Sequence, residues 1–364
     1  MEPGPWIVFG QQVFGDEEYD LVDGGNLPRL KLMMAAGLAS VLASSMANAA
    51  TFGPKTMQKD LPARDIDRTL HMAKGWVEFA LGYDHKVGTG AWGADGSRNP
   101  FESAKWTYQT EHLTVRYGLA PRTELWWYAE YHQARLFNEA LGTDTRDHGL
   151  GDQQVGYRYS IYERSAPGTS IVFETSMKMP SGKEAPGTYI GGPLNVSGFV
   201  FTTGTTDLYA GFGAKYTAGP IAFTGRAGYN RRFSGVVNYL IEVEQYQFQG
   251  RIKPGDQIMA SVDVMAQLGP IALSVTPKME YRMATKQGTS SGGLFPARRL
   301  RKVPQSDGLA LDLESRFQFQ VNRNLDLEFY TNIPLVGQDL QFFPIEDIHP
   351  TLGPTFGGAV EVRY

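Results

Sequence analysis

Residues 309–333 read LALDLESRFQFQVNRNLDLEFYTNI, and this stretch decides the fold. Apolar and polar side chains alternate along residues 309–321 and again along residues 325–333, on either side of the turn Asn322-Arg323-Asn324. Alternation with a period of two is typical of a strand with one apolar and one polar face. Each arm has roughly the ten residues that a tilted strand needs to cross a bilayer, whereas strands of soluble sheets usually have about five or six. The stretch therefore predicts one hairpin of a transmembrane β-barrel.

The composition excludes several other classes of protein. The chain has 364 residues, 42% of them hydrophobic and 20% charged, and it contains no cysteine, so it has neither a disulfide framework nor a thiolate metal site. After residue 49 no segment holds the roughly eighteen consecutive apolar residues of a membrane-spanning helix. In a membrane-spanning barrel, lipid-facing apolar residues alternate with inward-facing ones, so no continuous apolar segment marks a span. Acids and bases are equal in number after residue 49, which gives no support for a nucleic-acid partner.

Residues 29–49 have the features of a secretory signal peptide. Arg29 and Lys31 form a basic part, residues 32–42 form a short apolar run, and Ala47-Asn48-Ala49 is an A-x-A cleavage site. A buried core helix is the alternative interpretation. The acidic leader before Arg29 is one that signals do not normally carry, and a misassigned translation start would explain it. We expect residues 1–49 to be a leader and signal peptide that is removed.

Residues 50–73 are polar and lack a strand periodicity, so they are not expected to be a barrel strand. They predict a periplasmic lead-in, and a short plug that enters the barrel is the alternative. Residues 74–364 are expected to form the barrel itself.

The alternation of residues 309–333 recurs along the chain. It predicts about twelve strands, at residues 75–83, 105–119, 123–135, 152–162, 169–179, 206–216, 221–231, 257–268, 271–283, 309–321, 325–333 and 355–364. The connections between them are alternately short and long. Outer-membrane barrels have short periplasmic turns and long outer loops, and an even number of strands leaves both termini periplasmic. The sequence therefore predicts an all-β, antiparallel, up-and-down barrel in the outer membrane of a Gram-negative bacterium.

Aromatic residues near the strand ends fit the same location. Tyr117, Trp127 and Tyr216 resemble the girdle that outer-membrane barrels carry at the lipid interfaces. The last strand alternates apolar residues and ends on the aromatic Tyr364. This pattern resembles the signal by which such barrels are recognised for assembly, which makes the barrel assembly machinery an expected partner beside outer-membrane lipid.

Two blocks resemble a family of outer-membrane barrels, the proteins of the MetA pathway of phenol degradation. One is DHGLGD, residues 147–152, which leads into the strand QQVGYRY, residues 153–159. The other is TGTTDLYAGFG, residues 203–213. The resemblance implies a barrel that provides passage through the outer membrane for small molecules, among them apolar or aromatic ones.

Charged side chains lie on the face opposite the apolar one, and in a barrel that face lines the lumen. They fit either a cross-strand network that fills and rigidifies the interior or a charged eyelet that selects solutes. The predicted lumen-lining and transport residues are Glu124, Glu130, Arg158, Glu174, Lys178, Lys215, Arg226, Asp263, Lys278, Glu280, Arg282, Asp312, Glu314, Arg316, Asp326 and Glu328.

Pro277 stands inside an otherwise regular strand, although proline cannot donate to a β-ladder. A local bulge or a shifted register is one explanation. The other is a kink that opens a side exit in the barrel wall, through which apolar cargo leaves into lipid.

Two of the expected outer loops have an unusual composition. One is basic and is expected either to bind lipopolysaccharide phosphates or to be simply solvated; its residues are Arg298, Arg299, Arg301 and Lys302. The other is apolar and is expected either to fold inward as a gate or to pack on its own barrel; its residues are Phe342, Phe343, Pro344, Ile345 and Ile348.

No segment carries the motif of an enzyme or of a cofactor or metal site. The six histidines show no H-E-x-x-H spacing, and none lies in the H-x-S-N-G type of segment that outer-membrane phospholipases carry. We therefore expect a channel or transporter for small-molecule solutes, with no catalytic residue, cofactor or metal. A plugged barrel with a structural or surface-interaction role is the alternative, and an outer-membrane hydrolase is a more remote one.

Overall fold

The computed structural model describes residues 62, 64–93, 95–102, 104–140, 142–165, 168–182, 188–189, 201–202, 204–241, 246–289, 300–302, 307–338 and 352–364. The expected leader and signal peptide lie outside these residues. The chain divides into two units, residues 1–54 and residues 55–364, and the second unit contains all the structure described below.

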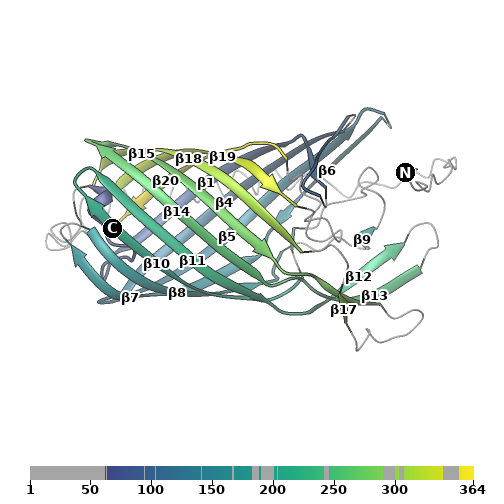
Figure 1. The fold of residues 1–364 in the computed structure, drawn as a ribbon, viewed down its shortest axis with the longest axis horizontal. Coiled ribbons are helices and arrows are strands. Elements are labelled where there is room, and N and C mark those ends of the chain that lie inside the picture. The colour runs from purple at the N-terminus through teal and green to yellow at the C-terminus, as the bar shows by residue number, and fades with distance from the viewer. Residues whose placement is uncertain are drawn as a thin grey trace, which may run out of the picture. The chain divides into compact units, whose positions relative to one another are not determined.

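The second unit is a closed antiparallel β-barrel of twelve strands, as the alternation predicted (Figure 1). Each strand pairs with its neighbours in the sequence, and the sheet closes where the first strand pairs with the last. The strands are β1 (Val77–Gly88), β4 (Ala104–Ala120), β5 (Thr123–Asn138), β7 (Gln153–Ser165), β8 (Gly168–Met179), β10 (Asp207–Ala218), β11 (Ile221–Arg232), β14 (Gln257–Leu268), β15 (Ile271–Arg282), β18 (Gly308–Asn322), β19 (Leu325–Gly337) and β20 (Thr355–Arg363). Closure leaves no unpaired edge, which matters because each unpaired backbone group in hydrocarbon costs several kcal/mol.

All the short connections lie at one end of the barrel, which we call the short-turn end; the C-terminus lies there too (Figure 1). Two of these turns are Gly-Pro pairs whose glycines, Gly219 and Gly269, have φ angles of 62° and 64°. A positive φ at the first turn position suits two-residue hairpins, because its twist matches that of the strands.

The opposite, long-loop end is more ordered than the sequence suggested. Segments that were expected to be loops form short strands there, because their main chains pair with one another or with a barrel strand. They are β2 (Gly90–Trp92), β3 (Arg98–Pro100), β6 (Thr143–Leu150), β9 (Thr188–Tyr189), β12 (Gly235–Ile241), β13 (Tyr246–Lys253), β16 (Lys286–Thr289) and β17 (Arg301–Lys302). These expected loops therefore contain short paired strands. Within the described part of the chain, no helix is long and apolar enough to span a membrane.

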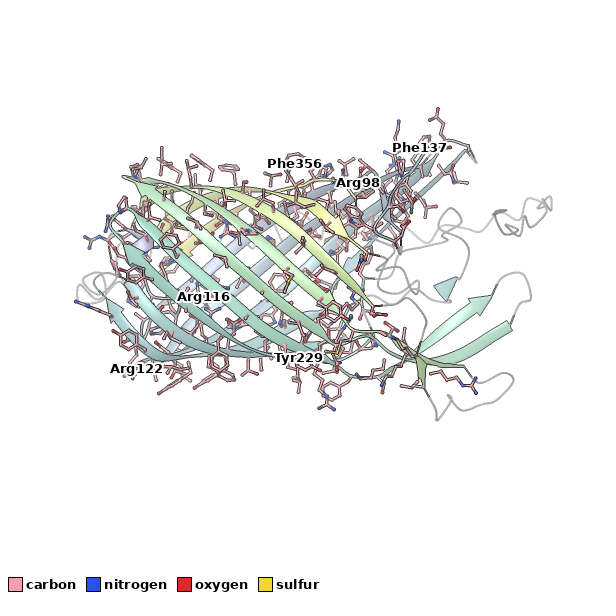
Figure 2. All side chains as sticks on the ribbon, viewed as in Figure 1. Arg98, Arg116, Arg122, Phe137, Tyr229 and Phe356 are labelled. Atoms are coloured by element: carbon pink, nitrogen blue, oxygen red, sulfur yellow. The ribbon has the colours of Figure 1, made fainter. Side chains whose placement is uncertain are left out.

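The outward face of the barrel is a belt of large apolar side chains (Figure 2). Such residues are normally buried, but here they are exposed on strands all around the cylinder, among them Phe212, Val262, Leu273 and Phe329, which are 58%, 51%, 54% and 58% exposed. A contiguous apolar surface of this size is unfavourable in water. It suits the hydrocarbon of a bilayer, where outer-membrane barrels carry an outward apolar band.

Substitutions at Val262, near the middle of β14, test whether the apolar belt lies in lipid. We expect Val262→Arg to destabilise the folded barrel in lipid by about 2–4 kcal/mol, because an arginine near the bilayer midplane loses its hydration. Val262→Leu should have little effect. Urea titration of protein folded in vesicles measures both free energies, and an equal effect of the two substitutions would show that this face is not in lipid.

Candidate functional site: the barrel lumen

Residues 64–76, which we call the inner segment, run inside the barrel. Three of its main-chain N–H groups donate to side chains of three separate strands: Ile66 to Gln267 of β14 at 3.1 Å, Leu70 to Ser170 of β8 at 3.1 Å, and Met72 to Glu124 of β5 at 2.5 Å. One segment reaches strands so far apart around a closed sheet only from within it. On each of these strands, the side chains at every second position from the acceptor share its face and therefore point into the lumen.

The tip of the inner segment is a short 3₁₀ helix, η2 (Asp65–Asp67), near the short-turn end. Lys215 Nζ donates to the carbonyl oxygens of Asp65, at 3.1 Å, and of Arg68, at 2.8 Å. Arg68 pairs with Asp65 and, at 3.2 Å, with Asp326. These contacts tie the described part of residues 50–73 to the barrel strands β10 and β19.

The pKa values of two titratable groups in the inner segment are shifted in opposite directions. Burial raises the pKa of Asp65, although the charge of Arg68 acts to lower it. Burial lowers the pKa of His71, although Glu163, 3.1 Å away, acts to raise it. A raised acid pKa favours docking of the segment at low pH, and a lowered histidine pKa favours docking at high pH. The two effects on the pH dependence of docking therefore offset each other.

Glu124 is the centre of a charged cluster under the inner segment. Its side chain is fully buried, at 0% exposure. Arg116 donates two hydrogen bonds to it, at 3.0 and 2.9 Å, and Arg158 donates one at 2.8 Å. Arg158 also pairs with Glu174 at 2.7 Å, and both arginines donate to the carbonyl oxygen of Leu70. The cluster ties four adjacent strands, β4, β5, β7 and β8, and the inner segment together.

A second cluster at the same end surrounds Arg363. Its guanidinium pairs with Glu78, Glu361 and Asp326, and Glu78 also accepts a hydrogen bond from Arg116 at 2.8 Å. Three of these lumen residues, Glu78, Arg116 and Glu361, were missed by the sequence-based selection. The signal that could have found them is the alternation itself, because Glu78 stands between Val77 and Phe79 and Arg116 between Val115 and Tyr117.

A third cluster lies farther along the lumen, on strands β15, β18 and β19. Glu314 accepts hydrogen bonds from Lys278 at 2.5 Å and from Arg316 at 2.8 Å, and Arg316 also pairs with Glu328 at 3.3 Å. Neighbouring charges of opposite sign thus compensate one another across the strands. For these residues the contacts fit the network interpretation better than an unpaired selective ring.

Other predicted lumen residues form hydrogen bonds outside the three clusters. Asp263 accepts from Thr276 at 2.7 Å, Asp312 from Asn332 at 3.2 Å, Glu280 from Gln257 at 2.7 Å, and Glu130 from Tyr128 at 2.9 Å. Arg282 lies 3.5 Å from Glu280. Arg226 differs from all the others, because its guanidinium forms no ion pair or hydrogen bond with any residue that the structure describes.

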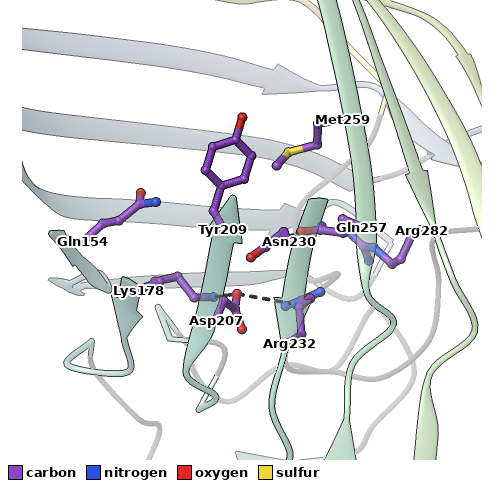
Figure 3. Close-up of a pocket in the computed structure, with 9 residues that line it drawn as sticks. All are labelled: Gln154, Lys178, Asp207, Tyr209, Asn230, Arg232, Gln257, Met259 and Arg282. Carbon is purple, nitrogen blue, oxygen red and sulfur yellow. Dashed lines mark hydrogen bonds and ion pairs between the residues drawn. The ribbon is translucent and has the colours of Figure 1, made fainter. Parts of the chain in front are cut away.

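An outer cavity of about 440 Å³ lies where β10, β11, β14 and β15 approach the long-loop end (Figure 3). Its long-loop side is an ion-paired row in which Asp207 contacts Lys178 at 2.7 Å and Arg232 at 3.5 Å. Above this row, Tyr209 and Met259 project into the cavity (Figure 3). The outer cavity therefore offers both charged and apolar surface.

A middle cavity of about 290 Å³ lies deeper in the lumen and shares Tyr209 and Met259 with the outer one. Arg226, Lys278 and Asp312 also line it. A third cavity, of about 600 Å³, surrounds the inner segment at the short-turn end. Open volume is thus present along the barrel, and the inner segment occupies its short-turn end.

The lumen wall formed by β4 and β5 carries aromatic side chains in addition to the charged Arg116, Glu124 and Glu130. The ring of Trp126 lies flat over Gly156 of the next strand, where an added Cβ would come within 2.1 Å of the ring. Farther out, His132 stacks on Tyr108 and on Phe201, with centroid distances of 5.2 and 5.5 Å. The rule of polar side chains inside, which selected the lumen residues, therefore holds only in part on these two strands.

Pro277 interrupts the pairing of β15 with β14 without shifting its register. Partners are present up to Ser261 and Lys278 and resume at Val264 and Val275 in the same register. The pairing of Pro277 with β18 is continuous. The bulge or register shift offered as one explanation is therefore wrong, and a local gap in the ladder takes its place.

The two unusual loops are only partly described. Arg301 and Lys302 are exposed in β17. Arg298, Arg299 and the apolar residues 342–348 lie outside the described residues. In the described part of the chain, no three His, Asp or Glu side chains are grouped to hold a metal ion.

Comparison with known proteins supports the fold. No protein-family model and no curated protein matches the sequence. Among solved structures, the chain is similar to the COG4313 outer membrane channel from Pseudomonas putida F1, with a TM-score of 0.58 and 11% identity over 80% of this chain and 97% of that one. Looser similarities include the Pseudomonas putida toluene transporter TodX, with a TM-score of 0.41 and 9% identity over 80% and 88% of the two chains. At such identities the likeness concerns architecture: this chain has the fold of an outer-membrane β-barrel.

Proposed function

We propose that the protein is an outer-membrane channel for small molecules, apolar or aromatic ones among them, in a Gram-negative bacterium. The observation that carries the proposal is a closed cylinder with apolar residues outside and cavities inside. The aromatic wall of β4 and β5 offers ring surfaces to aromatic solutes. The similar P. putida protein is described as an outer membrane channel, and TodX as a toluene transporter.

Reconstitution of the purified protein tests the channel directly. In planar bilayers we expect discrete current steps, and in liposomes we expect entry of small aromatic solutes above the rate of protein-free vesicles. A barrel that passes neither ions nor solutes in both assays would contradict the proposal.

The same proposal includes the family of the protein, its orientation in the membrane and its partners. Membership of the MetA-pathway proteins of phenol degradation rests on residues 147–159 and 203–213. We place the short-turn end and both mature termini in the periplasm, because outer-membrane barrels have their short turns there. Lipopolysaccharide at the long-loop end and the assembly machinery at the strand that ends near Tyr364 are the partners this orientation implies.

A plugged barrel with a structural or surface role is the second candidate, and the inner segment is the observation that favours it. Arg116, Arg158 and Lys215 all bind main-chain carbonyls of this segment. The two candidates differ in one respect, namely whether solutes pass while the segment is docked. A deletion phenotype with no change in solute uptake would favour the structural role.

We further propose a side exit at the gap beside Pro277. On the lumen side only the hydrogen bond from Thr276 to Asp263, at 2.7 Å, spans the unpaired stretch of β14 and β15. Pro277→Val restores a backbone donor, so we expect it to pair the ladder and slow the transfer of an apolar dye from lumen to lipid several-fold. Ion conductance should stay the same. Equal dye transfer in the variant and the unchanged protein would rule out the exit.

A further inference from the structure

We infer that Arg226 anchors the carboxylate of a small amphipathic acid, aromatic or aliphatic, in the middle cavity. The inference rests on the proposed channel function and specifies one substrate class for it.

The strand register leaves Arg226 without an acid beside it. Its neighbours across the sheet are Gly213 on β10 and Ser261 on β14. Arg158, by contrast, has an acid directly opposite on each side, and it pairs with both. Arg226 forms no ion pair or hydrogen bond with a described residue, so its guanidinium is available to a ligand.

The other charges of the middle cavity are already engaged. Lys278 donates to Glu314 at 2.5 Å, Glu280 accepts from Gln257, and Asp312 accepts from Asn332 at 3.2 Å. Each acid of the cavity therefore has a partner within the wall. Arg226 is the charged side chain of this cavity that has no hydrogen bond to a described residue, and a carboxylate satisfies a guanidinium with two parallel hydrogen bonds.

The surface around Arg226 suits the apolar part of such an acid. Tyr209 lies against Gly211 and Gly228, where an added Cβ would come within 2.2 and 2.3 Å of its side chain, so the glycines let it lie close to the wall. Tyr209 and Met259 line both the outer and the middle cavity, and Arg226 pairs with Gly213, farther from the long-loop end, so a molecule from that end meets Tyr209 and Met259 before it reaches Arg226. Tyrosine and methionine side chains both make favourable contacts with rings and alkyl groups.

The size of the cavity limits the ligand. Its volume of about 290 Å³ is at the lower end of the range for ligand sites, roughly 300–1,000 Å³. A one-ring or short-chain acid fits this space.

Benzoate and its uncharged analogue benzamide test the inference with the same barrel. In planar bilayers at neutral pH, each solute is titrated and its concentration-dependent block of the ion current is measured, and its flux into liposomes is measured in parallel. We expect benzoate to block the current at lower concentration than benzamide. Arg226→Gln should raise the blocking concentration of benzoate at least several-fold and leave that of benzamide unchanged. Arg122→Gln, at an exposed short turn and not among the residues that line the middle cavity, should change neither.

The outcomes separate this inference from the channel proposal. Failure of both solutes to enter liposomes, together with the absence of current, overturns the channel proposal and this inference with it. Passage of both solutes with equal block, or an equal effect of Arg226→Gln on both, overturns the role of Arg226 alone. If Arg226→Gln does not fold, Arg226→Lys takes its place. That variant keeps the charge but loses the two-pronged geometry, and it should still weaken the block by benzoate and not by benzamide; an unchanged ratio would contradict the inference.

Discussion

Deletion of residues 50–73 should raise the single-channel conductance of the barrel several-fold. The described part of this stretch lies within the lumen, where Lys215 and Arg158 hold its carbonyl oxygens and Glu124 accepts a hydrogen bond from Met72. No neighbouring strand could fill the vacated space, because every strand is already paired on both sides. Ion current at the short-turn end should then depend on the width of the lumen and not on the inner segment.

Deletion of residues 50–63 alone is the matched control for this experiment. It shortens the same end of the chain but keeps the hydrogen bonds made by Ile66, Leu70 and Met72. We expect planar-bilayer recordings to show nearly unchanged conductance for this control. If the longer deletion also leaves the conductance unchanged, the inner segment does not limit passage and the barrel is closed elsewhere.

Substitution of Glu124 should have the largest effect on stability. We expect Glu124→Gln to destabilise the barrel by about 3–5 kcal/mol, because it leaves Arg116 and Arg158 close together in a buried site without their shared carboxylate. The side chain keeps its size, so the loss measures charge rather than packing. Urea titration of the barrel in vesicles measures the difference in the free energy of unfolding.

Glu111→Gln provides the comparison for Glu124→Gln. Glu111 lies on the neighbouring strand β4, is exposed, and makes only a long hydrogen bond to Gln133, at 3.4 Å. The same chemical change there should alter the free energy of unfolding by no more than about 0.5 kcal/mol. Equal effects at the two positions would mean that the cluster around Glu124 contributes little to stability.

The two experiments also probe the link between stability and closure. Glu124 binds both the wall and the inner segment, whereas the guanidinium of Arg226 forms no ion pair or hydrogen bond with any residue that the structure describes. A variant at Glu124 should therefore lower stability and loosen the inner segment together. A variant at Arg226 should alter solute selectivity with little change in stability.

The sequence by itself determined the class of fold, the number of strands and the fact that all the short turns lie at one end of the barrel. These features are local: alternation with a period of two reports which residues share a face, and turn residues such as Gly219 and Gly269 mark where the chain reverses. The same alternation put charged residues such as Arg158 and Asp326 on one face. It was incomplete on β4 and β5, because aromatic side chains such as Trp126, which covers a glycine of the next strand, share the lumen face with the charged ones.

Only the tertiary structure decided which of the charged residues meet. Pairing depends on register and on closure of the sheet, which bring Glu78 beside Arg363 although almost the whole barrel separates them in the sequence. It also brought residues 64–76 into the lumen, where their main-chain groups bind strands from all around the cylinder, and it left Arg226 between a glycine and a serine. Alternation along one strand carries no information about the neighbour across it, so an ion-paired arginine and an available one look the same in the sequence.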